Sequence, residues 1–280
     1  MDAWKDGKLY AAKDLTISPY DHGFLYGLGF FETFRTYNGK VFLWNEHWTR
    51  LSKALQDYCI TLPYEEKDIV NAIHQLYVSN DSLDGYYRLN VSAGVHDIGL
   101  QPSSYQLPTV IVFRKPLVVP ARDTEKTAVW LETRRNSPEN GVRHKSHHFA
   151  NNVSARLELD SLANKEGFFL TAHGYVAEGI TSNIFWVKDG KLFTPSIDTG
   201  ILAGITRDWI LKNAKIEIEV GLYTKEDLEL ADEVFITNAV QELIPIREIG
   251  TVSFLGNQGP VYRELLNFYI ASIEEEGKDR

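Results

Sequence analysis

Three short segments between residues 143 and 207 carry side chains that could perform chemistry together. Lys145 lies in the first segment and is followed by two histidines and a pair of asparagines. Glu178 lies in the second, directly before a glycine, and Gly204-Ile205-Thr206 opens a helical pattern in the third. An amine can bond covalently to a carbonyl compound, a carboxylate can pair with a cationic ring nitrogen, and a helix N-terminus can bind an anion.

These three groups are the ones needed to hold pyridoxal 5′-phosphate. A lysine amine forms a Schiff base with the aldehyde of this cofactor, so Lys145 is the predicted catalytic residue. Glu178 would pair with the pyridine nitrogen, and the N–H groups of Ile205 and Thr206, with the Thr206 hydroxyl, would receive the phosphate. Each residue alone has an ordinary explanation: a solvated lysine, an exposed turn carboxylate, and a threonine that caps its helix. Their occurrence in one ordered set is what indicates the cofactor.

Arg50 is a further candidate for the phosphate. It lies in an amphipathic helical pattern, where most arginines are surface residues, but a guanidinium fits a phosphate dianion with two hydrogen bonds. Two other patterns do not indicate a site. Gly27-Leu28-Gly29 lacks the third glycine of a dinucleotide-binding fingerprint. The histidines near Lys145 have no cysteine or carboxylate at ligand spacing, so no metal site is expected.

Composition places the chain among ordinary globular proteins and argues against several classes. Of its 280 residues, 44% are hydrophobic and 24% are charged, enough to bury a sizeable core. The net charge of -9 argues against a nucleic-acid-binding protein but not against an anionic small substrate, because a pocket can carry the opposite local sign. Cys59 is the only cysteine, so no intrachain disulfide can form. Since neither a signal peptide nor an apolar stretch of about 20 residues is present, we expect a cytoplasmic protein without a membrane segment.

The hydrophobic pattern predicts an α+β protein of two mixed domains rather than a doubly wound parallel sheet. Strands are often joined by tight turns, and Asp189-Gly190 is the strongest hairpin signal. The predicted strands are 86–93, 108–113, 128–132, 167–172, 184–188, 191–194 and 233–237, and the predicted helices lie within 41–57 and at 150–164, 205–215 and 224–230. A linker at 115–123 would separate a smaller N-terminal α/β domain, 1–118, from a larger C-terminal domain, 119–280, that carries Lys145. A cofactor would lie between the two domains.

Taken together, four collinear motifs resemble the fold-type IV pyridoxal-phosphate enzymes, the class IV aminotransferase family. The resemblance runs from Asp21-His22-Gly23 through the Lys145 and Glu178 segments to 235–239, nearly the whole chain. It implies that Lys145 is the Schiff-base lysine, Glu178 the partner of the pyridine nitrogen and Arg50 a phosphate ligand. The further cofactor contacts that it implies are Ser182, Asn183, Ile205, Thr206, Thr237 and Asn238. Relatives of this fold work as homodimers, so we expect a homodimer.

Within this family the sequence resembles the 4-amino-4-deoxychorismate lyases, which form 4-aminobenzoate and pyruvate in folate biosynthesis. Phe31 stands where D-amino-acid aminotransferases often carry a tyrosine, and the loop 94–99 lacks their carboxylate-binding arginine. The predicted substrate contacts are Phe31, Thr33 and Arg88, with Thr33 as a candidate proton relay and Lys145 moving the proton at the amine-bearing carbon. Since this substrate carries two carboxylates, Arg35 and Arg143 are candidates to bind them alongside Arg88. The alternatives are a branched-chain or D-amino-acid aminotransferase with the same cofactor, and a cofactor carrier without catalysis.

Overall fold

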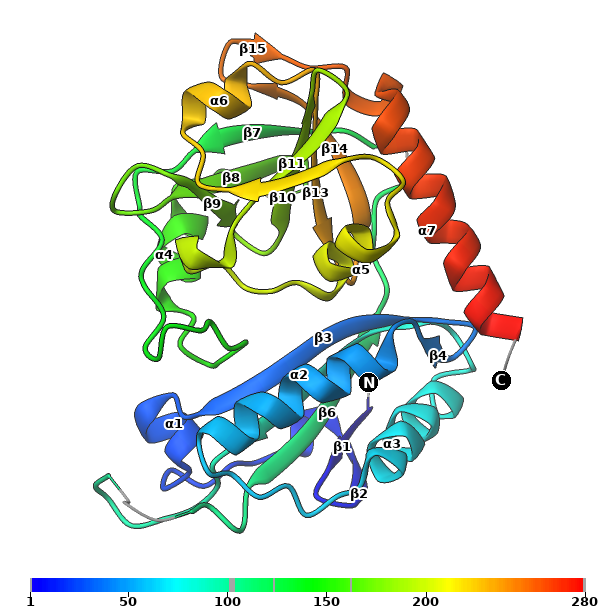
Figure 1. Ribbon diagram of the computed structural model, residues 1–280. Helices are drawn as coiled ribbons and strands as arrows, with labels where there is room; N and C mark the ends of the chain where they lie inside the picture. The colour runs from blue at the N-terminus through cyan, green and yellow to red at the C-terminus, as the bar shows by residue number, and fades with distance from the viewer. Residues whose placement is uncertain (1, 101–103, 123, 162, 279–280) are drawn as a thin grey trace. The chain divides into compact units, whose positions relative to one another are not determined.

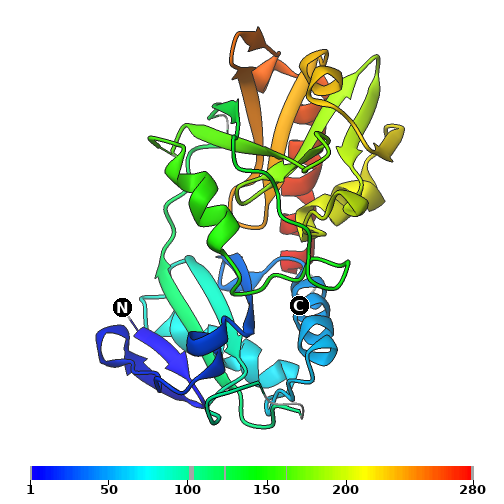
Figure 2. The ribbon, with the colours of Figure 1, turned by 90° about the vertical axis from the view of Figure 1, so that its left-hand side faces the viewer.

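The computed structural model describes residues 2–100, 104–122, 124–161 and 163–278, and the chain divides into two compact units. The first unit consists of residues 1–118, 144–148 and 276–280, and the second consists of 119–143 and 149–275. Figures 1 and 2 show the chain from two directions. Within its described part, the chain has no helix that is both long enough and apolar enough to cross a membrane.

The first unit contains a six-stranded antiparallel sheet with the strand order β2-β1-β6-β5-β3-β4. The strands are β1 (Asp2–Lys5), β2 (Lys8–Ala11), β3 (Gly29–Tyr37), β4 (Lys40–Val41), β5 (Gly85–Ser92) and β6 (Thr109–Pro116). The helices are α1 (His22–Tyr26), α2 (Trp44–Asp57) and α3 (Glu66–Val78). In both views α2 and α3 lie on the same side of this sheet, where their buried apolar residues form one core with the strands.

Because side chains alternate along a strand, this sheet has a core face and a polar face. The β3–β5 register pairs Phe30 with Val91 and Phe34 with Tyr87, and these residues all belong to the core under the helices. Thr33, Arg88 and Asn90, which alternate with these core residues, point to the opposite face and are half-buried. The expected strand at 86–93 is thereby confirmed as β5.

The segment that carries Lys145 pairs with the beginning of β3. It forms an antiparallel bridge and two hydrogen bonds, one from Phe31 N–H to the Lys145 carbonyl and one from His147 N–H to the Gly29 carbonyl, both 2.9 Å. These contacts place Lys145 in the first unit. Its predicted place in the C-terminal domain is wrong, because position along the chain does not reveal pairing with a distant strand. The domain boundary at residue 118 stays a prediction.

The second unit is built on a nine-stranded mixed sheet with the order β12-β11-β10-β13-β14-β7-β8-β9, and β15 pairs with β14. The strands are β7 (Lys126–Trp130), β8 (Lys165–Leu170), β9 (Val176–Gly179), β10 (Asn183–Lys188), β11 (Lys191–Pro195), β12 (Ile218–Gly221), β13 (Glu233–Asn238), β14 (Glu242–Ile249) and β15 (Val252–Ser253). Three of its pairings are parallel and the others antiparallel. The predicted hairpin is confirmed, because Asp189 and Gly190 both adopt positive φ between β10 and β11.

Four helices accompany this sheet: α4 (Ala150–Leu157), α5 (Ile205–Asn213), α6 (Lys225–Glu229) and α7 (Pro260–Lys278), whose last residues belong to the first unit. The ring of Tyr262 on α7 lies 6.0 Å from that of Phe235 on β13, and Tyr269 lies 4.9 Å from Trp209 on α5. The prediction of a helix over 150–164 is too long, since α4 ends at Leu157. Part of the extra length, Leu162, lies outside the described residues.

Candidate active site residues

The polar face of the first unit's sheet carries four of the predicted site residues. The β3–β5 register places Phe31 opposite Asn90 and Thr33 opposite Arg88. Lys145 shares this face, because its backbone pairs with Phe31 and its amine lies against the Phe31 ring. The structure therefore brings together the predicted catalytic lysine and the three predicted substrate contacts, although they come from separate parts of the sequence.

Phe31 is the point of contact between two cationic side chains on this face. Arg88 Cζ lies 3.5 Å from the centroid of the Phe31 ring, and Lys145 Nζ lies 4.8 Å from it. Burial lowers the pKa of Arg88. Among residues 2–278 as far as they are described, no carboxylate forms an ion pair with Arg88. A half-buried guanidinium beside an amine is suited to bind an acidic molecule.

Arg50 lies on α2, also in the first unit, where it is paired with a carboxylate. Its Nε and Nη2 atoms donate to the two oxygens of Glu32 at 2.8 and 2.6 Å, and His47 Nδ1 lies 2.7 Å from the same carboxylate. Burial alone would raise the pKa of Glu32, but the Arg50 charge and its hydrogen bonds bring it down to about 2. Glu32 thus fixes the orientation of the Arg50 guanidinium. The role of Arg50 as a phosphate ligand stays a prediction.

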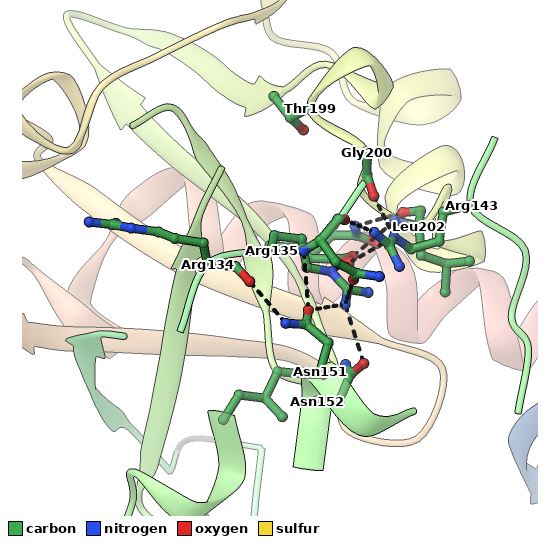
Figure 3. A network of polar contacts seen from close by, with 12 residues as sticks. Arg134, Arg135, Arg143, Asn151, Asn152, Thr199, Gly200 and Leu202 are labelled. Atoms are coloured by element: carbon green, nitrogen blue, oxygen red, sulfur yellow. Dashed lines mark hydrogen bonds and ion pairs between the residues drawn. The ribbon is translucent and has the colours of Figure 1, made fainter. Parts of the chain in front are cut away.

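Glu178 lies on β9 in the second unit, and it is buried beside Arg135, Arg143 and Leu202, which Figure 3 labels. Its oxygens accept hydrogen bonds from Arg135 Nε at 2.7 Å and from the Leu202 N–H at 3.0 Å, and Arg143 Nε lies 3.9 Å away. Burial and the neighbouring Arg135 charge lower the pKa of Arg143 to about 10. An ionised carboxylate has about four acceptor positions. Glu178 therefore keeps acceptor capacity for the N–H of a bound pyridinium ring.

The asparagine pair Asn151–Asn152 on α4 supports the same network (Figure 3). Arg135 Nη1 donates to Asn151 Oδ1 at 2.7 Å and lies 3.3 Å from Asn152 Oδ1. Asn152 Nδ2 in turn donates to the Ile180 carbonyl. Since a guanidinium held at several donors cannot turn without breaking hydrogen bonds, Arg135 holds the Glu178 carboxylate in one position.

The beginning of α5 and the end of β13 provide groups that fit a phosphate. Gly204 is the N-cap of α5 and offers no side-chain hydrogen bond to the first N–H groups of the helix. The hydroxyls of Thr206 and Thr237 are buried without a hydrogen-bond partner in the described chain. A buried hydroxyl without a partner costs about 1–3 kcal/mol, and a helix N-terminus attracts anions. The alternative in which Thr206 caps α5 is wrong, because the cap is Gly204.

The other predicted cofactor residues of the second unit have side chains that bond to protein groups. Asn183 Nδ2 donates to the Leu202 carbonyl at 2.9 Å, and a Cβ on Gly204 would lie 1.9 Å from Asn183 Oδ1. Ser182 donates to the buried Glu166 carboxylate at 3.3 Å. Asn238 Oδ1 accepts two backbone N–H groups of the β13–β14 turn. These side chains shape the loops around the α5 N-terminus, and their direct contact with a cofactor stays a prediction.

Sequence patterns alone do not predict Glu32, His47 or Arg135. Glu32 occupies a position between Phe30 and Phe34 that alternation assigns to the core, and a buried carboxylate there needs a cation. His47 and Arg50 are three residues apart and so lie on one helix face, and this spacing could have indicated the cation that Glu32 needs. Arg135 follows β7 in a loop and has no comparable signal.

The chain is similar in sequence and in structure to proteins of one known family. A family model described as amino-transferase class IV matches residues 29–249. The chain is 42% identical to aminodeoxychorismate lyase of Bacillus subtilis, over 96% of this chain and 94% of that protein. It is 36% identical to a putative branched-chain-amino-acid aminotransferase of Methanocaldococcus jannaschii, over 89% of this chain and 88% of that protein. It is 30% identical to D-alanine aminotransferase of Listeria innocua, over 98% and 96% of the two chains. The crystal structure of Escherichia coli branched-chain amino acid aminotransferase matches with a TM-score of 0.85 and 28% identity, over 96% of this chain and 93% of that one. The likeness confirms the predicted α+β class.

Proposed function

Since the chain belongs to the class IV aminotransferase family, we propose that it is a pyridoxal-phosphate-dependent lyase that converts 4-amino-4-deoxychorismate to 4-aminobenzoate and pyruvate. The observation that carries this proposal is the 42% identity to an aminodeoxychorismate lyase over almost the whole of both chains. The identities to the putative branched-chain aminotransferase and the D-alanine aminotransferase named above are lower, at 36% and 30%.

The residues present fit the cofactor. When bound, pyridoxal 5′-phosphate supplies an aldehyde that bonds to amines and a ring that withdraws electrons from the neighbouring carbon. Thr206, Thr237 and the first N–H groups of α5 would hold its phosphate, and Glu178 would hold its pyridine nitrogen. Lys145 would bond to its aldehyde, and Arg50 would add a cationic contact to the phosphate.

Lys145 also moves the proton in the proposed reaction. Its Nζ would take the proton from the amine-bearing ring carbon of the substrate. The bond from the adjacent ring carbon to the enolpyruvyl oxygen then breaks, the ring becomes aromatic, and the departing fragment takes a proton to become pyruvate. Arg88 would meet a substrate carboxylate, and Thr33, its neighbour across the strand pair, would relay a proton. Phe31 keeps Arg88 and Lys145 on one surface.

The proposal is tested with the purified protein, pyridoxal phosphate and 4-amino-4-deoxychorismate, with 4-aminobenzoate measured by chromatography. We expect the wild type to form product, Lys145→Ala to form none, and the exposed control Lys8→Ala to match the wild type. A wild type that forms no 4-aminobenzoate would refute the lyase function. Conversion of the bound cofactor to its amine form by a branched-chain or D-amino acid would then favour the aminotransferase alternative.

The proposal includes a homodimer in the cytoplasm. The resemblance to homodimeric relatives supports the dimer, and a chain whose only cysteine is Cys59 suits a reducing compartment. Light scattering of the purified protein should give the mass of two chains. A mass of one chain at micromolar concentration would contradict the dimer without affecting the reaction.

A further inference from the structure

Three side chains on the polar face of the first unit's sheet are in contact: Arg88, Asn90 and His147. The proposed reaction assigns a role only to Arg88. We propose that the side-chain N–H groups of Asn90 bind a carboxylate of the ligand beside Arg88, and that His147 sets the orientation of the Asn90 amide. The inference rests on the proposed function for the identity of the substrate, whereas the carboxylate site itself rests on the contacts and protonation of Arg88, Asn90 and His147.

The orientation of the Asn90 amide follows from its neighbours. The amide lies 3.3 Å from Arg88 Nε and 2.9 Å from His147 Nε2 through the same atom, Oδ1. A guanidinium can only donate hydrogen bonds, so the atom that faces it must be an acceptor. His147 must then carry its proton on Nε2. The Nδ2 group of Asn90 points the other way, and it donates to no residue that the structure describes.

His147 reaches Asn90 because residue 29 has no side chain. His147 and Gly29 are paired in the backbone, so both lie in one row across the sheet edge, and a Cβ on Gly29 would lie 2.4 Å from His147 Cε1. The imidazole therefore lies over Gly29 and reaches the side-chain amide of Asn90, which is paired with Phe31, two residues further along β3. Burial and the nearby Arg88 charge lower the pKa of His147 to about 4. At neutral pH the ring is uncharged and has one N–H, which it gives to Asn90.

The donors on this face match a carboxylate. The Arg88 guanidinium is stacked on Phe31 at 3.5 Å, which holds its plane, and it has no carboxylate partner in the described part of the chain. Lys145 lies against the same ring, so a carboxylate bound by Arg88 and Asn90 would sit near the reactive amine. The whole chain has a net charge of -9, yet the charged side chains that meet at Phe31 are both cationic. An amide beside the guanidinium adds a directed donor and leaves the charge unchanged.

The test is calorimetric titration of the cofactor-loaded protein with benzoate, a ring carboxylate that lacks the reactive amine, and with benzamide, its neutral counterpart. We expect Asn90→Ala to weaken benzoate binding about tenfold and Asn90→Asp to weaken it more, through charge repulsion, with benzamide changed less than twofold. The exposed control Asn45→Ala should match the wild type. His147→Phe should weaken benzoate severalfold, whereas His147→Gln, which keeps a donor, should restore much of the affinity.

The outcomes separate this inference from the proposed function. Benzoate affinity that is unchanged in Asn90→Ala, or a wild type that does not bind benzoate, overturns the carboxylate site even if 4-aminobenzoate is formed. An equal loss of benzamide and benzoate binding would also overturn it, since it would indicate a general distortion of the face. Absence of 4-aminobenzoate from the wild type, with benzoate binding dependent on Asn90, would remove the lyase function and leave the site in place.

Discussion

Replacing Glu32 by glutamine tests whether the ion pair under α2 stabilises the first unit. The ordinary pKa of the Glu32 carboxyl, 4.5, falls to about 2 in the folded protein. A tenfold change in an equilibrium constant is about 1.4 kcal/mol, so this difference corresponds to about 3 kcal/mol of stability at pH 7. Glu32→Gln also leaves Arg50 and His47 without their carboxylate partner, and breaking a buried ion pair in other proteins costs about 3–5 kcal/mol. The two estimates agree.

Hydrogen–deuterium exchange is the suitable assay, because it reports the opening free energy of each segment separately. We expect peptides from α2 and β3 to lose about 3 kcal/mol of protection free energy in Glu32→Gln, while peptides from β10 and β13 in the second unit stay unchanged. The control Glu264→Gln removes an exposed carboxylate on α7 and should alter neither set. Equal protection in Glu32→Gln and Glu264→Gln would refute the assigned role of the ion pair.

The stability difference between wild type and Glu32→Gln should depend on pH in one direction. Because the folded-state pKa of Glu32 is below its unfolded value, the stabilisation is complete well above pH 4.5 and is lost as the pH falls toward 2. The gap between wild type and Glu32→Gln should therefore be largest near pH 7 and shrink below about pH 4.5. A gap that widens on acidification would show that the carboxylate is not the stabilising species.

Two further predictions concern the second unit. Thr206→Val and Thr237→Val remove hydroxyls that have no described partner, so the protein without cofactor should keep its stability or gain slightly. The affinity for pyridoxal phosphate, measured by absorbance titration, should fall at least tenfold in each variant. Unchanged cofactor affinity in both would argue against this phosphate site. Arg135→Met leaves the buried Glu178 without its closest cation. It should lower the unfolding free energy of this unit by about 3–5 kcal/mol in a urea titration. Arg135→Lys should not restore the stability, since a lysine cannot donate from several nitrogens of one plane as the guanidinium does.

The sequence was sufficient for the parts of the site that are coded locally. The helix at 205, the Asp189-Gly190 hairpin and the strand at 86–93 depend on nearby residues, and the structure confirms all three. Lys145, Glu178 and Thr206 could be proposed because their residue types suit a cofactor, and their roles remain to be tested by the experiments above.

The parts that could not be predicted depend on contacts between distant segments. Strand β3 was not predicted because Phe31 and Glu32 interrupt the simple alternation of buried and exposed residues, and both are buried for different reasons. Nothing in the local sequence shows that residues 145–147 pair with this strand. The local sequence does not distinguish Asn90 from an ordinary polar residue of a half-exposed strand, since its partner His147 is 57 positions away.

The alternation of β3 connects stability with the candidate chemistry. On one face of the strand, Glu32 orients Arg50 under α2; on the other, Phe31 carries Arg88 and Lys145. Because side chains of a strand alternate with a period of two, a shift of one residue in register would move Phe31 to the core face and Glu32 to the polar face. The buried ion pair penalises that shift strongly, since it would separate Glu32 from its cation. The ion pair therefore helps to define the face on which Lys145 meets its predicted substrate contacts, and Glu32→Gln should disturb this face as well as the core.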